Sequence, residues 1–213
     1  MKVLENKSRR GRPTKNNGNF RDTKLELIRC GLAHLTENGF VASGLDKILK
    51  QAGVPKGSFY FYFSSKEVFG HEVLQSYAKY FEDKLDRFLL DTTYPPLARI
   101  KNFVEDAKCG MTKHHFKRGC LVGNLGQEVA LLPDSFREKL IEIFVSWQNR
   151  VAECLRQAQL NGEISKVANC HDIAAFFWTG WEGAVTRAKL EESVKPLDNY
   201  VAFFLSGLPK AQV

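Results

Sequence analysis

Apolar residues recur at intervals of three and four along almost the whole chain, and this period restricts the fold more than any other feature. Near the start, Leu25, Ile28, Leu32 and Leu35 follow it, and the clearest stripe runs through residues 136–155. Side chains spaced in this way share one face of an α-helix, whereas a half-buried strand alternates at every second residue. The sequence shows no convincing alternation, no internal repeat and no glycine-rich phosphate loop. The chain is therefore predicted to be all-α.

Capping residues and glycines divide this pattern into separate helices. A serine or threonine followed three residues later by glutamate forms a capping box, and such pairs predict helix starts at Thr23 and Ser64. Ser43 can cap a short helix that Gly53 ends, and a third short segment, 56–63, follows it. After a turn at residues 93–96, further helices are expected at roughly 97–115, 121–131, 135–160, 170–190 and 196–207.

Positive charge is concentrated in the first third of the chain. The formal net charge is +7, and residues 1–66 alone hold 13 lysines and arginines against 5 acidic residues. A basic segment on a near-neutral body is the footprint of a domain that faces nucleic-acid phosphates, although a solvated charged surface gives the same balance. Residues 1–19 are interpreted as a flexible basic arm. Its Arg10 and Arg12 either enter a narrow minor groove or only keep the tail solvated.

Composition predicts a cytoplasmic protein with no membrane partner. The hydrophobic fraction is 44% and the charged fraction 26%, as is typical of globular proteins. No apolar run approaches the roughly 20 residues that span a bilayer, and the polar N-terminus lacks the apolar stretch of a signal peptide. The five scattered cysteines contain no CxxC pair, so free thiols are expected rather than disulfides or a zinc site.

Residues 43–63 have the layout of a helix-turn-helix, in which two short helices meet across a glycine-containing turn. In the second helix, Phe59 and Phe63 are four residues apart and are expected to pack inward. Lys56 and Tyr60 are also four apart and lie on another face, which suits contact with phosphates and base edges. The alternative is an aromatic helix buried in a hydrophobic core.

The same region resembles the N-terminal domain of TetR-family repressors. The resemblance is carried by Gly39-Phe40, Leu45 to Ile48, Ala52-Gly53-Val54, Lys56-Gly57-Ser58-Phe59-Tyr60, Phe63 and Ser65-Lys66-Glu67. The chain departs from the usual family pattern at Pro55, at Tyr62 and at Ser43-Gly44, and the last departure bears on one phosphate contact.

The resemblance implies an all-helical homodimer that binds a pseudo-palindromic double-stranded operator. Residues 20–66 would form the three-helix DNA-binding domain, and residues 67–213 would form a helical bundle for ligand binding and dimerisation. The last two long helices would form the dimer interface. The DNA-contacting residues that it implies are Ser43, Lys56, Gly57, Ser58, Tyr60, Tyr62 and Lys66.

Two segments of the second domain are similar to a TetR branch that responds to acrylate, N-ethylmaleimide and related small electrophiles. They are residues 118–128, which begin Arg-Gly-Cys, and residues 181–189, from Trp181 to Lys189. Cys120 follows Lys117 and Arg118 at an expected helix start, where cations and a helix N-terminus favour the reactive thiolate. Cys120 is therefore a candidate sensor, and the alternative is a small apolar residue in the core.

A small-molecule inducer is the expected partner of this domain, with no cofactor. The candidate pocket residues besides Cys120 are Phe103, Phe116, Asn124, Gln127, Trp178 and Lys189, although Lys189 can equally be a solvated surface lysine. His114 and His115 lack the acidic partner and spacing of a metal site, so no metal is expected. Gly180 and Gly183 would let a partner helix approach closely.

Two other classes of function compete with a ligand-responsive repressor. An enzyme is disfavoured because the sequence contains no nucleophile elbow, no recognisable acidic pair and no cofactor loop. A nucleoid-type DNA-binding protein without ligand control would use the basic arm, but it would not need an aromatic-rich region of about 145 residues.

Overall fold

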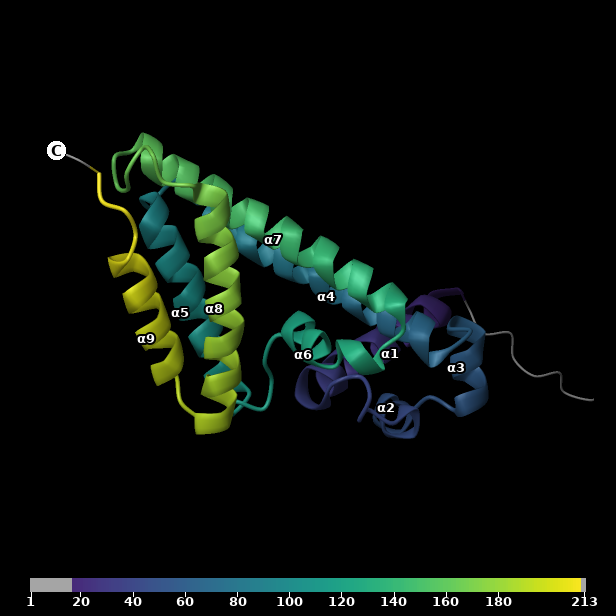
Figure 1. Cartoon of the computed structure of the whole chain (residues 1–213). Helices are drawn as coiled ribbons and strands as arrows, with labels where there is room; N and C mark the ends of the chain where they lie inside the picture. The colour runs from purple at the N-terminus through teal and green to yellow at the C-terminus, as the bar shows by residue number, and fades with distance from the viewer. Residues whose placement is uncertain (1–16, 212–213) are drawn as a thin grey trace, which may run out of the picture.

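The computed structural model describes residues 17–211, with side chains from Asp22 onward, so most of the predicted arm, with Arg10 and Arg12, lies outside the described residues. The described part is all-α and contains no strand, which confirms the predicted class (Figure 1). Its helices are α1 (Asn17–Asn38), α2 (Leu45–Ala52), α3 (Lys56–Tyr62), α4 (Lys66–Leu89), α5 (Pro96–Lys113), α6 (Leu121–Gln127), α7 (Asp134–Leu160), α8 (Cys170–Glu191) and α9 (Lys195–Ser206).

Three of the predicted helix starts are wrong. Helix α1 begins at Asn17, so Thr23 lies inside it rather than at its start. The residue that precedes α2 is Gly44, because the Ser43 hydroxyl donates instead to the Gly39 carbonyl at 2.6 Å. The cap of α4 is Ser65 rather than its neighbour Ser64, since the Ser65 hydroxyl accepts from the Val68 N–H.

The predicted helix 121–131 is shorter in the structure. Helix α6 ends at Gln127, and a single 3₁₀ turn, Val129–Leu131, follows it. Glu128 breaks the helix with φ −91° and ψ 0°, and its side chain turns back to the first domain. Helix α5 also ends early, because His115 and Phe116 adopt the left-handed backbone conformation. This local turn carries the chain from α5 towards α6.

Helices α1, α2 and α3 pack on the start of α4 around an aromatic cluster. The rings of Phe59, Phe63 and Phe69 lie with centroids 5.0 to 5.4 Å apart, and all three side chains are buried. Helix α1 approaches α4 at Gly31, where an added Cβ would lie 2.4 Å from the Phe69 ring. This cluster anchors α3 to the start of α4.

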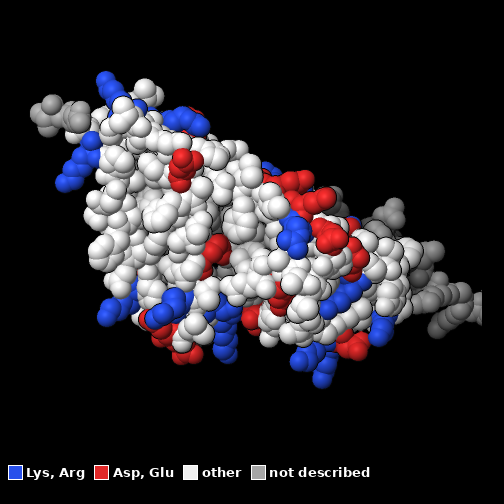
Figure 2. All heavy atoms as spheres, viewed as in Figure 1, with Lys and Arg blue, Asp and Glu red and all other residues white. Residues whose placement is uncertain are grey.

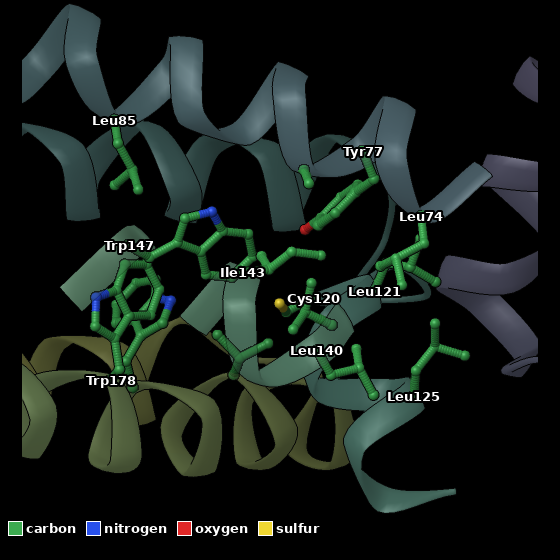
Figure 3. Close-up of a cluster of buried hydrophobic side chains, with 14 of the residues drawn as sticks. Leu74, Tyr77, Leu85, Cys120, Leu121, Leu125, Leu140, Ile143, Trp147 and Trp178 are labelled. Carbon is green, nitrogen blue, oxygen red and sulfur yellow. The ribbon is translucent and has the colours of Figure 1, made fainter. Parts of the chain in front are cut away.

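Helix α4 continues into the second domain and runs beside α7, while α5, α8 and α9 pack at its far end (Figure 1). The core there is aromatic. Trp147 of α7 lies 5.0 Å from Trp178 of α8 and 4.3 Å from Phe81 of α4, measured between ring centroids. Figure 3 shows this cluster extending from the two tryptophans to Cys120 and Tyr77. Among the described residues, no helix is long and apolar enough to cross a membrane.

Candidate DNA interface and ligand cavity

Helix α3 divides its residues as the sequence predicts. Phe59 and Phe63 are buried, whereas Lys56, Gly57 and Tyr60 are exposed. The Lys56 ammonium lies 3.4 Å from the Asp46 carboxylate, in an ion pair that is open to solvent. An exposed cation beside a glycine and a phenol is a surface that a phosphate backbone can approach closely.

Four of the predicted DNA contacts are less exposed than the sequence suggests. Ser43 is buried, and its hydroxyl donates to the Gly39 carbonyl, so it stabilises the loop before α2 rather than facing solvent. Lys66 is half-buried, donates to the Phe40 carbonyl at 2.8 Å and lies 4.5 Å from the Phe40 ring centroid. Ser58 and Tyr62 are only partly exposed. The side chains most available to DNA are therefore those of Lys56 and Tyr60.

Phe61 was missed by the sequence analysis. Its side chain is 73% exposed at the middle of α3, beside Tyr60. The signal was present, because a helix that turns residues 59 and 63 inward must turn residue 61 outward. A large exposed aromatic ring on this short helix extends the candidate interface.

Helix α6 and its flanks hold the loop between α1 and α2 through polar contacts. The Glu128 carboxylate accepts from the N–H groups of Phe40 and Val41 at 2.8 and 3.1 Å. Before α6, the Arg118 guanidinium donates to the Glu37 carboxylate at 2.8 Å. Displacing α6 must therefore move the loop that precedes α2.

Asn124 adds a third contact from the middle of α6. Its side-chain amide donates to the Thr36 carbonyl near the end of α1, at 2.8 Å. Gly39, which adopts φ +77°, is needed beside this contact region because an added Cβ would overlap the Glu128 carboxylate. Asn124 was predicted to line a ligand pocket, but in the structure it joins α6 to α1.

A cavity of about 310 Å³ lies at the junction of the two domains. Its walls are mainly apolar and aromatic, with the Tyr80 hydroxyl, the Lys84 ammonium and the His114 imidazole among the polar groups at its lining. It is lined by Leu32 and Thr36 of α1, Tyr77, Tyr80, Phe81 and Lys84 of α4, Ala107, Gly110 and Met111 of α5, Trp181 and Val185 of α8, and His114, Arg118, Gly119 and Cys120. Its volume is at the small end of the range for ligand pockets.

Cys120 lines this cavity, but its thiol is not the low-pKa group that the sequence predicts. The residue is buried and precedes α6, where its sulfur accepts from the Gly123 N–H at 3.4 Å. Burial raises the pKa of the Cys120 thiol well above its usual value, and the Glu182 carboxylate raises it further. The predicted effect of the two basic neighbours fails because Lys117 is exposed and Arg118 is paired with Glu37.

Glu182 of α8 was not among the predicted site residues, and it lies near Cys120 without lining the cavity itself. Its Oε1 atom is buried without a hydrogen-bond partner, and burial raises the pKa of the carboxyl from 4.5 to about 7. The carboxylate lies against Gly123, where an added Cβ would be 1.8 Å from Oε2. The resemblance included Glu182 in the segment 181–189, but spacing along the chain could not place it against Gly123, because the two residues meet only in the folded chain.

The other predicted pocket residues do not line the cavity. Phe103 and Trp178 are buried in the aromatic core behind it. Gln127 is exposed and donates to the Thr186 hydroxyl, and Phe116 packs on the core at the turn after α5. The Lys189 side chain lies over Gly119, next to Cys120, and burial lowers the pKa of its ammonium.

Helices α8 and α9 present an apolar surface to solvent. Phe176, Gly183 and Leu190 are spaced by seven residues on α8 and are all exposed, and Phe203 of α9 is 78% exposed. Figure 2 shows few charged groups over the middle of this face. Gly183 has open space where a Cβ would lie, whereas the Tyr200 ring of α9 occupies that space at Gly180. Only Gly183 is therefore free for a neighbouring helix.

No group of three or more histidine, cysteine or acidic side chains that could hold a metal ion occurs between residues 17 and 211. His114 lines the cavity, and burial lowers the pKa of its imidazole.

Sequence profiles of two families match the chain. Residues 27–73 match the profile described as bacterial regulatory proteins, tetR family, and residues 96–204 match the tetracyclin repressor-like C-terminal domain. The first match covers α2, α3 and parts of α1 and α4, and the second covers α5 to α8 and most of α9, which include part of the cavity wall and the apolar face.

Individual proteins match over most of their length. The chain is 48% identical over 201 residues to the transcriptional regulator AcuR of Cereibacter sphaeroides, covering 93% of this chain and 90% of that protein. It is 29% identical over 181 residues to the transcriptional repressor NemR of Escherichia coli, covering 85% and 91%. The crystal structure of a regulatory protein from Rhodobacter sphaeroides superposes with a TM-score of 0.86 at 48% identity, covering 87% and 98%.

Proposed function

The chain belongs to the TetR family of bacterial regulatory proteins, and on that basis we propose that it is a dimeric repressor that a small molecule releases from a pseudo-palindromic operator. Regulation of transcription through DNA binding follows from the family, whose matched members are regulators rather than enzymes. What we propose beyond the family is that the protein acts as a dimer, that a small molecule controls it, and that the small molecule acts through the cavity between the two domains.

Residues 20–66 would bind DNA, and residues 67–213 would bind the ligand and the second subunit. Lys56, Gly57 and Tyr60 would contact phosphates and base edges from α3, with Ser58 and Tyr62 beside them. Exposure on one helix face supports this assignment. Lys66 would act from the start of α4 by holding the Phe40 carbonyl.

The observation that carries ligand control is the position of the cavity. Leu32 and Thr36 of α1, in the DNA-binding domain, form part of its wall, and Cys120 at the start of α6 forms another part. A ligand in this cavity would touch α1 directly and would press on the helix whose contacts hold the α1–α2 loop. Since packed interiors resist small displacements, a shift at this junction would move α3.

The ligand would be a small electrophile or acyl compound that reacts with, or lies against, Cys120. Two observations support this class: the chain resembles the electrophile-responsive branch around Cys120, and the Cys120 side chain lines the cavity. Lys189 would be a second participant, because its side chain lies over Gly119. A non-covalent inducer in the same cavity is the alternative.

The dimer would form through the apolar face of α8 and α9. Phe176, Leu190 and Phe203 are large apolar residues whose exposure is costly in a monomer, and they extend over one face with Gly183 between them. A second copy related by two-fold symmetry would cover the same face on both chains.

Binding to DNA fragments tests the repressor against the nucleoid-type alternative. Anisotropy titrations would compare a palindrome from beside the gene with a scrambled fragment of equal length at several salt concentrations. A specific repressor prefers the palindrome by about 10³-fold or more, and its affinity falls with salt. Equal affinity for both fragments would contradict the proposal.

A further inference from the structure

The structure disfavours the deprotonated form of Cys120 that a covalent reaction with a ligand would need. The thiolate is the nucleophile, yet burial and a neighbouring carboxylate hold the pKa of this thiol well above its usual value. The position of Cys120 in the cavity wall favours reaction with a bound ligand, whereas its raised pKa keeps the thiol protonated and unreactive. A reactive thiol here needs a group that takes its proton.

Glu182 lies where such a group is needed. Helix α6 starts at Cys120, and three residues later Gly123 leaves room for the Glu182 carboxylate to come against the helix. A Cβ at Gly123 would be 1.8 Å from Glu182 Oε2 and 3.6 Å from the Cys120 Cβ, so the carboxylate and the cysteine border the same small space. Any larger residue at position 123 would separate them.

The carboxylate has unused hydrogen-bonding capacity. Glu182 Oε1 is buried and has no hydrogen-bond partner, which is costly for a charged oxygen and leaves it able to accept a proton. Burial holds the pKa of Glu182 at about 7, so at neutral pH it exists both with and without a proton. A base with a pKa near the working pH is the most effective one.

Few titratable groups face Glu182. One is the thiol of Cys120, the residue that precedes α6. The other is the hydroxyl of Tyr77 on α4, which Figure 3 shows pointing towards the Cys120 sulfur. Burial raises the pKa of Tyr77 as well, so the phenol stays neutral and does not compete as a base. On α8 itself the neighbours one turn away are Trp178 and Thr186, which are uncharged.

We propose that Glu182 is the proton acceptor that activates Cys120 for addition to an α,β-unsaturated compound in the cavity, an inference that rests on the covalent form of the proposed function. The Cys120 Sγ–H bond breaks as its proton moves to Glu182. A bond forms between Sγ and the β-carbon of the electrophile, whose carbon–carbon π electrons move to its carbonyl oxygen. The resulting enolate takes the proton back from Glu182 at its α-carbon, which leaves a neutral thioether and regenerates the carboxylate.

The rate of labelling of Cys120 by N-ethylmaleimide tests this step. Labelling is followed by peptide mass mapping in a Cys109→Ser background, because Cys109 is exposed and would react first. In the parent protein the rate should rise through pH 7 and level off above it. In Glu182→Gln the rate at pH 8 should fall about ten-fold or more, and it should rise with hydroxide throughout pH 6–9.

Whether the labelling rate falls or rises in Glu182→Gln shows whether Glu182 acts as a base or only as a negative charge beside the thiol. If Glu182 acts only as a negative neighbour, Glu182→Gln lowers the thiol pKa and labelling becomes faster. Glu182→Asp keeps the carboxylate at a greater distance and should retain the plateau at a lower rate. Glu138→Gln, which makes the same change on the exposed surface of α7, should behave as the parent. Thermal unfolding of each variant confirms that it is folded.

Two results would overturn the inference. One is that Cys120 of the Glu182→Gln variant is labelled as fast as in the parent protein, or faster, and with the pH profile of the parent. The other is operator release by the electrophile without mass added at Cys120, which would leave the ligand-responsive repressor standing with a non-covalent inducer. Failure of the repressor itself would instead appear as DNA binding that no such compound changes.

Discussion

At the scale of single residues, the two faces of α3 carry different consequences for substitution. Phe59 and Phe63 form the core of the DNA-binding domain with Phe69, so their loss would unfold the helix that presents the contacts. Lys56 lies outside that core, and its loss should affect DNA binding alone, whereas the Tyr60 ring also packs edge-on against Phe59. The distinction allows binding and folding to be tested separately.

Lys56→Ala should weaken operator binding without unfolding the protein. Its ion pair with Asp46 is exposed, and such pairs contribute little to stability. Losing one phosphate contact should weaken binding several-fold and reduce the salt slope by about 1. Anisotropy titrations at several salt concentrations measure both effects. Lys79→Ala, which breaks a comparable exposed pair with Asp83, is the control, and equal affinity of the two variants would reject the assignment.

Glu182→Gln should also change the dependence of stability on pH. The folded protein holds the Glu182 proton up to about pH 7, whereas the unfolded chain releases it near pH 4.5. Stability is therefore lost as the pH rises through this window, because the folded state must bury a charge. The variant should gain about 1–3 kcal/mol in free energy of unfolding at pH 8 and nothing below pH 4.5. Urea unfolding at both pH values measures this, and equal gains at the two would contradict it.

At the scale of elements, the period of the apolar residues was enough to predict every α-helix of the described chain, whereas local capping patterns misplaced several of their starts. Ser43 and Ser64 each have a neighbour that precedes the helix instead, and the tertiary contact of Ser43 with Gly39 decides the first case. The outward face of α3 was also predictable, since it follows from spacing within one helix. Glu128 and Glu182 were not, because their partners are distant in sequence.

Glu128 is expected to determine how firmly α6 holds the DNA-binding domain. Glu128→Gln removes the charge that faces Lys66 and replaces the charged Oε2 atom, which accepts from both backbone N–H groups, by a neutral amide group. Hydrogen bonds to charged groups contribute about 1.5–3 kcal/mol, so operator affinity should fall about ten-fold as the α1–α2 loop loosens. Operator binding by Glu138→Gln should not change. The role assigned to α6 would be wrong if both variants bound the operator equally well.

At the scale of the whole molecule, one chain carries the candidate DNA interface at one end and an apolar face with few charged groups at the other. Figure 1 shows α4 and α7 running between them, with α6 against the DNA-binding domain. Neither the cavity nor the contacts of α6 could be predicted from the sequence, since both arise where helices from the two domains meet. The proposed dimer came from the resemblance to a known family, and the exposed stripe of Phe176, Gly183 and Leu190 on α8 supports it.

Dimerisation should depend on that stripe. Light scattering should give about twice the chain mass of 24.2 kDa for the parent protein. Phe176→Glu places a charge in the apolar face and should give a single-chain mass. Leu160→Glu, at an exposed position at the end of α7, should remain dimeric. A monomeric parent at micromolar concentration would exclude the proposed assembly.

The central claim is that a small molecule in the cavity beside Cys120 empties the operator. The most direct measurement titrates the complex of protein and operator with N-ethylmaleimide, in parallel for the parent and for Cys120→Ser, and follows anisotropy at constant salt. The account predicts that the parent releases the operator and that Cys120→Ser retains it at concentrations that empty the parent. An operator complex of the parent that survives full modification of Cys120 would contradict the claim.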